Sequence, residues 1–188
     1  TNMLEVIGQS ILPIAMIFAL GFYIKRKKFA YVIFGVMTLG VLILLIPTVI
    51  TEINGNPLIA KMGVTQLTGA MEGKEVRFGP AASGYWSILT TAISTGSVNS
   101  MHDSSMALSG LMQMLAMLIN GFYGGCGVGI LNYFIYIIIA VFISGLMVGR
   151  TPEFLGHKVE AREVKIAALV TLLSAFIIKG GTALAAYY

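Results

Sequence analysis

Between residues 104 and 149 the chain reads SSMALSGLMQMLAMLINGFYGGCGVGILNYFIYIIIAVFISGLMVG, a run of 46 residues without one Asp, Glu, Lys or Arg. A membrane-spanning helix needs about 20 apolar residues, so this run is too long for one straight crossing. Near its middle, where a regular helix is not expected to continue, lie Gly124, Gly125, Cys126, Gly127 and Gly129. Non-helical backbone at membrane depth is tolerated only where protein buries it or where it lines a watery cavity. The run therefore predicts a broken membrane helix beside a transport path.

The composition indicates an integral membrane protein. The chain is 57% hydrophobic and 11% charged, with a mean hydropathy of +0.88. Soluble domains carry about 25% charged residues. The net charge of +4 comes largely from the cluster at residues 25–28 between two apolar stretches, which fits a cytoplasmic loop and requires no nucleic acid. The one cysteine, Cys126, excludes an internal disulfide, and small-residue packing is its favoured role.

The order of apolar and polar segments predicts an all-α membrane fold built around a pore unit of span, pore half-helix, filter loop and broken second span, as in potassium channels. A first apolar span over residues 3–23 precedes this unit. The unit's segments are expected over residues 30–51 (first span), 52–80 (extracellular loop), 81–95 (half-helix), 94–99 (filter) and 104–149 (broken span).

Length and charge support this assignment. The half-helix is too short to cross a bilayer, and the Gly-centred polar run after it is typical of a re-entrant loop. A single broken crossing, rather than a two-span hairpin, places the basic residues at 150, 158, 162 and 165 inside, as the positive-inside bias favours. Apolar segments lie directly at both ends of the chain, and we expect a piece of a longer polypeptide.

The loop after the half-helix has the groups that a dehydrated monovalent cation requires. Channel filters replace the ion's water with backbone carbonyls of an extended loop. The candidate filter residues are Ser94, Thr95, Gly96, Ser97 and Val98. Gly96 can take a positive φ and adds no Cβ to a pore, and the half-helix points its partly negative end at the loop. No acid lies in the loop, which suits a monovalent ion better than Ca²⁺. An ordinary polar loop is the alternative.

Other polar residues have structural interpretations. Asp103 could attract cations at the pore entrance, but it is rather expected to cap the following helix together with Ser104 and Ser105. His102 and His157 are expected on opposite faces of the membrane, so no metal site beyond the transported cation is predicted. The sequence offers no Ser/His/Asp set, Walker loop or paired intramembrane carboxylates, and no catalytic residue is assigned. The glycine-rich break either packs against a neighbouring helix or forms a gating loop, and gating is favoured.

Four motifs follow one another along the chain: MEGKEVRFG at 71–79, TTAISTGSV at 90–98 with MHDS at 101–104, GGCGVG at 124–129 and GRTPEFLG at 149–156. In this order they resemble the segment before the third pore loop, the loop itself, the glycine-rich break and the cytoplasmic signature of the KdpA family. This family contains the potassium-translocating subunit of the bacterial Kdp potassium pump. The resemblance covers essentially the whole chain.

The resemblance implies four span–pore–span repeats around one pore, related to potassium channels and to Trk/Ktr transporters. Residues 1–28 would be the closing span of repeat two with its cytoplasmic loop, residues 29–160 repeat three, and residues 161–188 the first span of repeat four. The filter residues Ser94 to Val98 would supply one quarter of the potassium-coordinating oxygens. Gly124, Gly125, Cys126, Gly127 and Gly129 would gate the path, and Arg150 and Glu153 would lie at a cytoplasmic interface.

The resemblance also implies partners. K⁺ would be the transported ion, with no organic cofactor. A P-type ATPase subunit (KdpB-like) would hydrolyse ATP, and a periplasm-facing accessory subunit (KdpC-like), the remaining repeats and membrane lipid would complete a multi-pass complex in the bacterial plasma (inner) membrane. Many family members have Cys-Gly-Ala where this chain has Thr95, Gly96 and Ser97, a change that a carbonyl-lined filter tolerates.

Two other functions compete with the ATP-driven one. A passive or ion-coupled cation transporter subunit of the Trk/Ktr type would use the same pore loop without an ATPase. A structural or assembly module of the membrane would use the glycines for helix packing, and cations would not affect it. An intramembrane hydrolase would also use re-entrant segments, but the chain lacks a plausible nucleophile–base pair.

Overall fold

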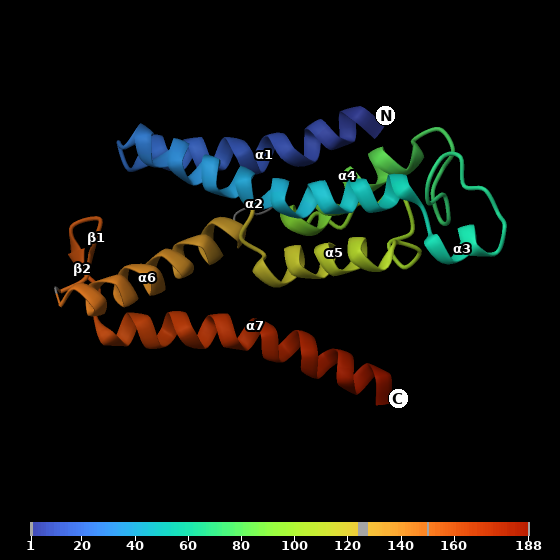
Figure 1. The fold of residues 1–188 in the computed structure, drawn as a ribbon. Coiled ribbons are helices and arrows are strands. Elements are labelled where there is room, and N and C mark those ends of the chain that lie inside the picture. The colour runs from blue at the N-terminus through green and yellow to red at the C-terminus, as the bar shows by residue number, and fades with distance from the viewer. Residues whose placement is uncertain (1, 124–127, 150, 188) are drawn as a thin grey trace. The chain divides into compact units, whose positions relative to one another are not determined.

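The computed structural model describes residues 2–123, 128–149 and 151–187. In chain order its elements are α1 (Asn2–Tyr23), α2 (Lys27–Asn54), α3 (Pro57–Lys61), α4 (Gly79–Ile93), α5 (Ala107–Ile119), α6 (Val128–Val148), β1 (Glu153–Phe154), β2 (His157–Lys158) and α7 (Ala161–Tyr187) (Figure 1). Of these, α1, α2, α6 and α7 are long and apolar enough to cross a membrane. The predicted helical membrane fold is therefore confirmed, while the boundaries of the pore repeat stay a prediction.

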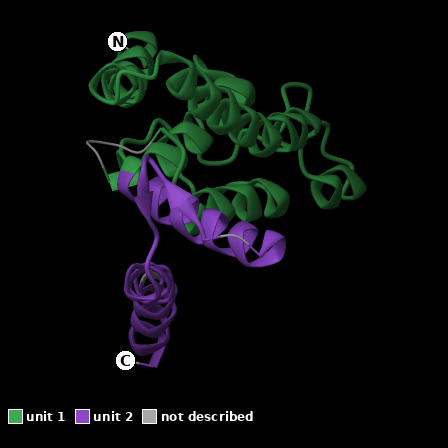
Figure 2. Cartoon of the chain, turned by 90° about the vertical axis from the view of Figure 1, so that its left-hand side faces the viewer, with its two compact units in different colours: residues 1–130 green, residues 131–188 purple. Residues whose placement is uncertain are grey.

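The chain divides into two compact units, residues 1–130 and residues 131–188 (Figure 2). In the first unit, α2 packs against α1, α4 and α5. Its buried residues recur every three or four positions, which places them along one face of the helix. They are Ala30, Ile33, Met37, Val41, Leu44, Thr48 and Glu52. The buried face thus ends in a carboxylate, where the pattern would otherwise call for an apolar side chain.

The short helix α4 is enclosed by α1, α2 and α5. Ten of its 15 residues are buried, so the helix lies inside the first unit. It is too short to cross a bilayer. The hydroxyls of Ser87 and Thr91 donate to carbonyls one turn back, at 2.8 Å each, which satisfies them within the helix. The helix ends at Ser94, whose backbone is left-handed with φ +60°. A short enclosed helix therefore precedes the predicted filter, and its C-cap is the first filter residue.

The uncharged run is interrupted between α5 and α6, as its glycines predict. α5 ends at Asn120, and the two aromatic residues that follow at 122 and 123 pack on α2. The Tyr123 hydroxyl donates to Thr38 Oγ1 at 2.6 Å. A Cβ on Gly40 would lie 2.3 Å from the Phe122 ring, so this glycine allows the ring to approach the helix. The chain is thereby fixed to α2 just before residues 124–127, which lie outside the described residues.

The predicted cap of α5 was wrong. The helix begins at Ala107, after Met106, so Asp103 lies three residues before the capping position. Its side chain is therefore too far from the first turn, since a capping oxygen reaches the N–H groups two or three positions ahead. A carboxylate from a different helix takes this place, because Glu52 Oε1 accepts the Met106 N–H at 3.0 Å.

The second unit contains a small β-hairpin that the all-α expectation omitted. β1 and β2 pair antiparallel, with Phe154 opposite His157. The two turn residues Leu155 and Gly156 have φ values of +51° and +85°, the conformation of a two-residue hairpin turn. The Phe154 ring packs edge-on against Phe134 of α6, 6.1 Å between centroids. Strands of two residues have no hydrophobic alternation, so periodicity could not predict them.

Candidate functional site

The predicted filter residues Ser94 to Val98 form one exposed, non-helical segment directly after α4. We refer to residues 94–99 as the filter segment. Gly96 has φ +76°, and among the described residues no heavy atom beyond its chain neighbours lies within 4 Å of the position that a Cβ would take. The last carbonyls of α4 face this segment with the partial negative charge of a helix C-terminus. The segment therefore offers oxygen atoms, open space and a favourable field for a cation.

Hydrogen bonds from both backbone and side chains hold the filter segment to α4. The indole Nε1 of Trp86 donates to the Ser97 carbonyl at 2.9 Å. The Thr95 N–H donates to the Thr90 carbonyl at 3.2 Å, and the hydroxyls of these two threonines lie 2.9 Å apart. Because Trp86 is 1% exposed, its ring has little freedom to move. The Ser97 carbonyl is directed towards α4, and the segment keeps a defined path behind its exposed face.

A carboxamide from α1 also contacts the filter segment. Gln9 Oε1 accepts hydrogen bonds from Thr95 Oγ1 at 3.1 Å and from Ser97 Oγ at 3.2 Å. Asn99 Nδ2 donates to Asn2 Oδ1 of the same helix at 3.4 Å. A helix more than 80 positions earlier in the sequence thus positions two of the candidate filter hydroxyls.

The start of the filter segment contacts the end of α5. The Ser94 hydroxyl donates to Asn120 Oδ1 at 2.7 Å. Asn120 is left-handed, with φ +39°, and ends the helix that precedes the glycine-rich break. The filter segment and the entrance to the break are therefore joined by one short side-chain contact.

The residues that directly follow the filter segment pair with an earlier loop. We call residues 69–79, which include the MEGKEVRFG motif and end at the first residue of α4, the strap. The Met101 N–H donates to the Gly73 carbonyl at 2.9 Å, and Lys74 forms an isolated antiparallel bridge with Ser100. A Cβ on Gly73 would lie 2.9 Å from Met101 Cβ. The strap and the chain leaving the filter segment are thus paired and closely packed.

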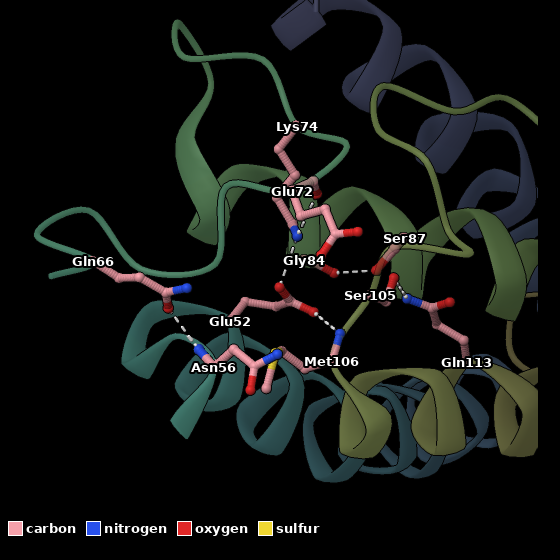
Figure 3. A network of polar contacts seen from close by, with 10 residues as sticks. All are labelled: Glu52, Asn56, Gln66, Glu72, Lys74, Gly84, Ser87, Ser105, Met106 and Gln113. Carbon is pink, nitrogen blue, oxygen red and sulfur yellow. Dashed lines mark hydrogen bonds and ion pairs between the residues drawn. The ribbon is translucent and has the colours of Figure 1, made fainter. Parts of the chain in front are cut away.

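A buried ion pair connects the strap to α2. Glu52 Oε2 lies 2.9 Å from Lys74 Nζ, and the two side chains are 1% and 3% exposed. Figure 3 shows the Glu52 carboxylate between the Lys74 ammonium and the Met106 backbone nitrogen. Lys74 Nζ also donates to the Glu72 carbonyl at 3.4 Å. Buried charges require such pairing, because an unpaired one loses its hydration without compensation.

His102 lies between the filter segment and α5 and is about half-buried. Burial lowers the pKa of its imidazole below the usual 6.5. Its Nε2 is buried and accepts or donates no hydrogen bond within the part of the chain that the structure describes. In that same part, no group of three or more His, Cys, Asp or Glu side chains could hold a metal ion.

Comparison with known sequences shows the family to which the chain belongs. A profile of the family described as "KdpA: Potassium-transporting ATPase A subunit" matches residues 1–188. The chain belongs to the KdpA family. It is 72% identical over 188 residues to a curated protein of Flavobacterium psychrophilum, and 70% identical over 188 residues to one of Flavobacterium johnsoniae. A third, from Phocaeicola vulgatus, is 63% identical over 186 residues.

All three relatives are named "Potassium-transporting ATPase potassium-binding subunit". The alignments cover 100%, 100% and 99% of this chain and 33% of each relative. The chain therefore spans about a third of the length of the curated relatives that it matches.

In this KdpA-family chain, the structure groups some of the predicted site residues and leaves others apart. The five filter residues lie together. Of the predicted gate, Gly124, Gly125, Cys126 and Gly127 lie outside the described residues, as does Arg150. Gly129 is buried in the first turn of α6, and Glu153 is exposed in β1. The gate and the cytoplasmic interface remain predictions.

Sequence reasoning missed residues that contact or support the filter segment, and Gln9, Trp86 and Glu52 are examples. Gln9 is a carboxamide inside an apolar span, Trp86 is the one tryptophan of the chain, and Glu52 is an acid at the end of an apolar helix. A polar side chain in a predicted span is a functional candidate by default, which could have found Gln9. Glu52 lies one residue beyond the predicted span, and only the structure places it within α2.

Proposed function

We propose that this chain is part of the potassium-binding and potassium-translocating subunit of an ATP-driven, high-affinity potassium uptake complex. The observation that carries the proposal is the exposed filter segment at the end of the enclosed helix α4, with Gly96 left-handed and open to space. Family membership and the names of the relatives support it. The chain spans about a third of those relatives and would contain one of the four pore loops, so it would supply one quarter of the filter, and the rest of the parent chain would complete the pore.

In the proposed site, oxygen atoms of Ser94, Thr95, Gly96, Ser97 and Val98 replace part of the hydration shell of K⁺. The C-terminal end of α4 favours the positive charge, and the missing side chain at Gly96 keeps the ion's path clear. Trp86 and Gln9 fix the segment from behind and from the side through the hydrogen bonds described above. No covalent step is needed, because conduction requires only binding that is favourable at entry and weak enough for release.

The proposal extends to gating and assembly. Gly124, Gly125, Cys126, Gly127 and Gly129 would form the gate beneath the filter, and the contact between Ser94 and Asn120 supports a link between the two. Arg150 and Glu153 would face the cytoplasm. A P-type ATPase subunit would hydrolyse ATP, a periplasm-facing accessory subunit would complete the complex, and its location would be the bacterial inner membrane.

Potassium-stimulated ATP hydrolysis by the complex of the full-length parent chain tests this proposal. Gly96→Asp should raise the potassium concentration for half-maximal stimulation at least about tenfold, since about 1.4 kcal/mol of lost binding has this effect. Gly63→Asp is the matched control, because Gly63 has φ +81° and the described residues leave the same open space around it. The control should keep the wild-type potassium dependence.

The outcomes separate the candidate functions. A changed potassium affinity in Gly96→Asp with intact assembly supports a filter coupled to an ATPase. Selective potassium flux that needs no ATPase partner would favour a passive or ion-coupled transporter. Equal behaviour of the two aspartate variants, with no effect of cation identity, would favour a structural module.

A further inference from the structure

The carboxylate of Glu52 joins three segments that are distant in sequence. It belongs to α2, its Oε2 contacts Lys74 of the strap at 2.9 Å, and its Oε1 accepts the N–H of Met106, directly before α5, at 3.0 Å. The Glu52 backbone carbonyl also accepts the Ala70 N–H at 2.8 Å, at the beginning of the strap. One residue of α2 therefore fixes the strap at two points and the start of α5 at a third (Figure 3).

The strap in turn holds the end of the filter segment. Lys74 pairs through its backbone with Ser100, the residue after this segment, while its side chain reaches Glu52. The adjacent Met101 N–H donates to the Gly73 carbonyl at 2.9 Å, and a Cβ on Gly73 would lie 2.8 Å from Ser104 Cβ, so the two chain segments are closely packed here. A shift of Lys74 would therefore move the chain that leaves the filter.

We infer that Glu52 and Lys74 are positioning residues for the potassium filter: their buried ion pair fixes the end of residues 94–99 by tying the strap to α2. This inference rests on the proposed function. The pair touches no ion itself and acts through the backbone of Ser100 and Met101. Hydrogen bonds from α4 and α1 hold residues 94–99 themselves, and the ion pair holds the chain directly after them, so loss of the pair should loosen that end only.

The arrangement distinguishes this pair from ordinary charges of a polar loop. Glu75 and Arg77, on the same strap, also form an ion pair, but their side chains are 45% and 76% exposed. Removing one partner of an exposed pair has little effect, because water replaces the lost contact. Removing one partner of the buried pair leaves a charge without hydration or a counter-ion, and the surrounding backbone must rearrange.

The experiment uses the full-length complex with its ATPase subunit in proteoliposomes. ATP hydrolysis is measured against K⁺ and against Rb⁺ for the wild type, Glu52→Gln, Lys74→Met, the double variant and the control Glu75→Gln. We expect each single variant to raise the KM for K⁺ about fivefold and to reduce the preference over Rb⁺, with kcat within about twofold, as for residues that modulate a distant site. The double variant should show a smaller rise of about threefold, since no lone charge remains. Glu75→Gln should match the wild type.

Three results would overturn the inference. The first is a wild-type KM and ion preference in Glu52→Gln. The second is a wild-type KM and ion preference in the double variant. The double variant retains no buried charge, so it tests the inference even if a single variant fails to assemble. The third is a loss of kcat and of assembled complex at unchanged KM, which would indicate a role in folding only. Absence of potassium stimulation in the wild type would instead count against the proposed function, and the Gly96→Asp complex separates the two cases.

Discussion

The filter segment and the strap are neighbouring loops that use glycine for opposite purposes. Gly96 in the filter segment has φ +76° and, within the described residues, open space where a side chain would be. Gly69 in the strap has φ +89°, but a Cβ there would lie 2.6 Å from the Glu52 carbonyl oxygen and 2.7 Å from that of Ile53. One glycine keeps space free, and the other lets two backbones meet. The open space at Gly96 is what a filter position requires, and the crowding at Gly69 identifies a packing residue.

The two loops also differ in their polar contacts, which are neutral in the filter segment and charged in the strap. Neutral hydrogen bonds from Trp86, Thr90 and Gln9 hold the filter segment, whose outer face stays exposed. The strap depends on the Glu52–Lys74 ion pair, which is almost fully buried. A neutral hydrogen bond contributes about 1 kcal/mol net, whereas breaking a buried ion pair costs about 3–5 kcal/mol. Changes in the strap should therefore affect stability first and ions only through the chain that leaves the filter segment, whereas changes in the filter segment should affect ions directly.

The largest effect on stability is expected for Gly69→Ala. The positive φ costs about 1–2 kcal/mol and the forced contacts with backbone atoms cost about 1–3 kcal/mol, so we expect a total near 3 kcal/mol. Thermal unfolding of the purified complex measures the loss. Gly79→Ala is the control in the same strap, because Gly79 has φ +73° with open space among the described residues. Equal destabilisation by the two alanines would contradict the crowding at Gly69.

The next effect should concern ion selection. Gly96→Ala adds a methyl group to open space, so the stability cost should stay near the roughly 1 kcal/mol of a left-handed alanine. We expect the preference for K⁺ over Na⁺ to fall about tenfold, since a strained filter loses its coordinating geometry. Cation-dependent ATP hydrolysis measures the preference, with Gly63→Ala as the matched open glycine. Normal selectivity in an assembled Gly96→Ala complex would remove the filter assignment.

The helices and the open glycine of the filter segment could be predicted from the sequence, because they depend on local patterns. Hydropathy predicted α1 and α2, the short length of the weakly apolar segment at residues 81–95 predicted a half-helix, and glycines predicted the break after α5. The left-handed Gly96 followed from its place in a polar run after that half-helix. These features depend on residues within one or two helical turns of each other, where composition is informative.

The contacts that hold the filter segment could not be predicted in this way. Gln9 reaches Thr95 and Ser97 from a different helix, and such contacts depend on how helices pack. Glu52 is the first residue of the predicted extracellular loop, although it completes the buried face of α2 and accepts the N–H before α5. Hydropathy treats every acid as exposed and has no information on pairing across the fold.

A smaller effect is expected when the neutral contacts of the filter segment are weakened. Trp86→Phe removes the donor to the Ser97 carbonyl, which should cost about 1 kcal/mol and raise the KM for K⁺ about fivefold. Ile88→Val is the control on the same helix, since Ile88 is fully buried and a methylene is lost without a polar contact. The control should lower thermal stability by a similar amount at unchanged KM. A similar KM in both variants would show that the indole serves packing alone.

The smallest effect is the pH dependence of stability that His102, which follows the filter segment, should cause. Burial lowers the pKa of His102 in the folded protein below the 6.5 of the unfolded chain. The unfolded state therefore binds more protons as the pH falls below about 6.5, so folding should weaken there, while at higher pH this residue contributes no pH dependence. Thermal unfolding of the complex at pH 7.5 and 5.5 should show a larger drop for the wild type than for His102→Gln. Because the ring is only half-buried, this drop should be smaller than the effect of Trp86→Phe, and identical pH dependence in the two proteins would mean that the ring is protonated equally well in the folded state.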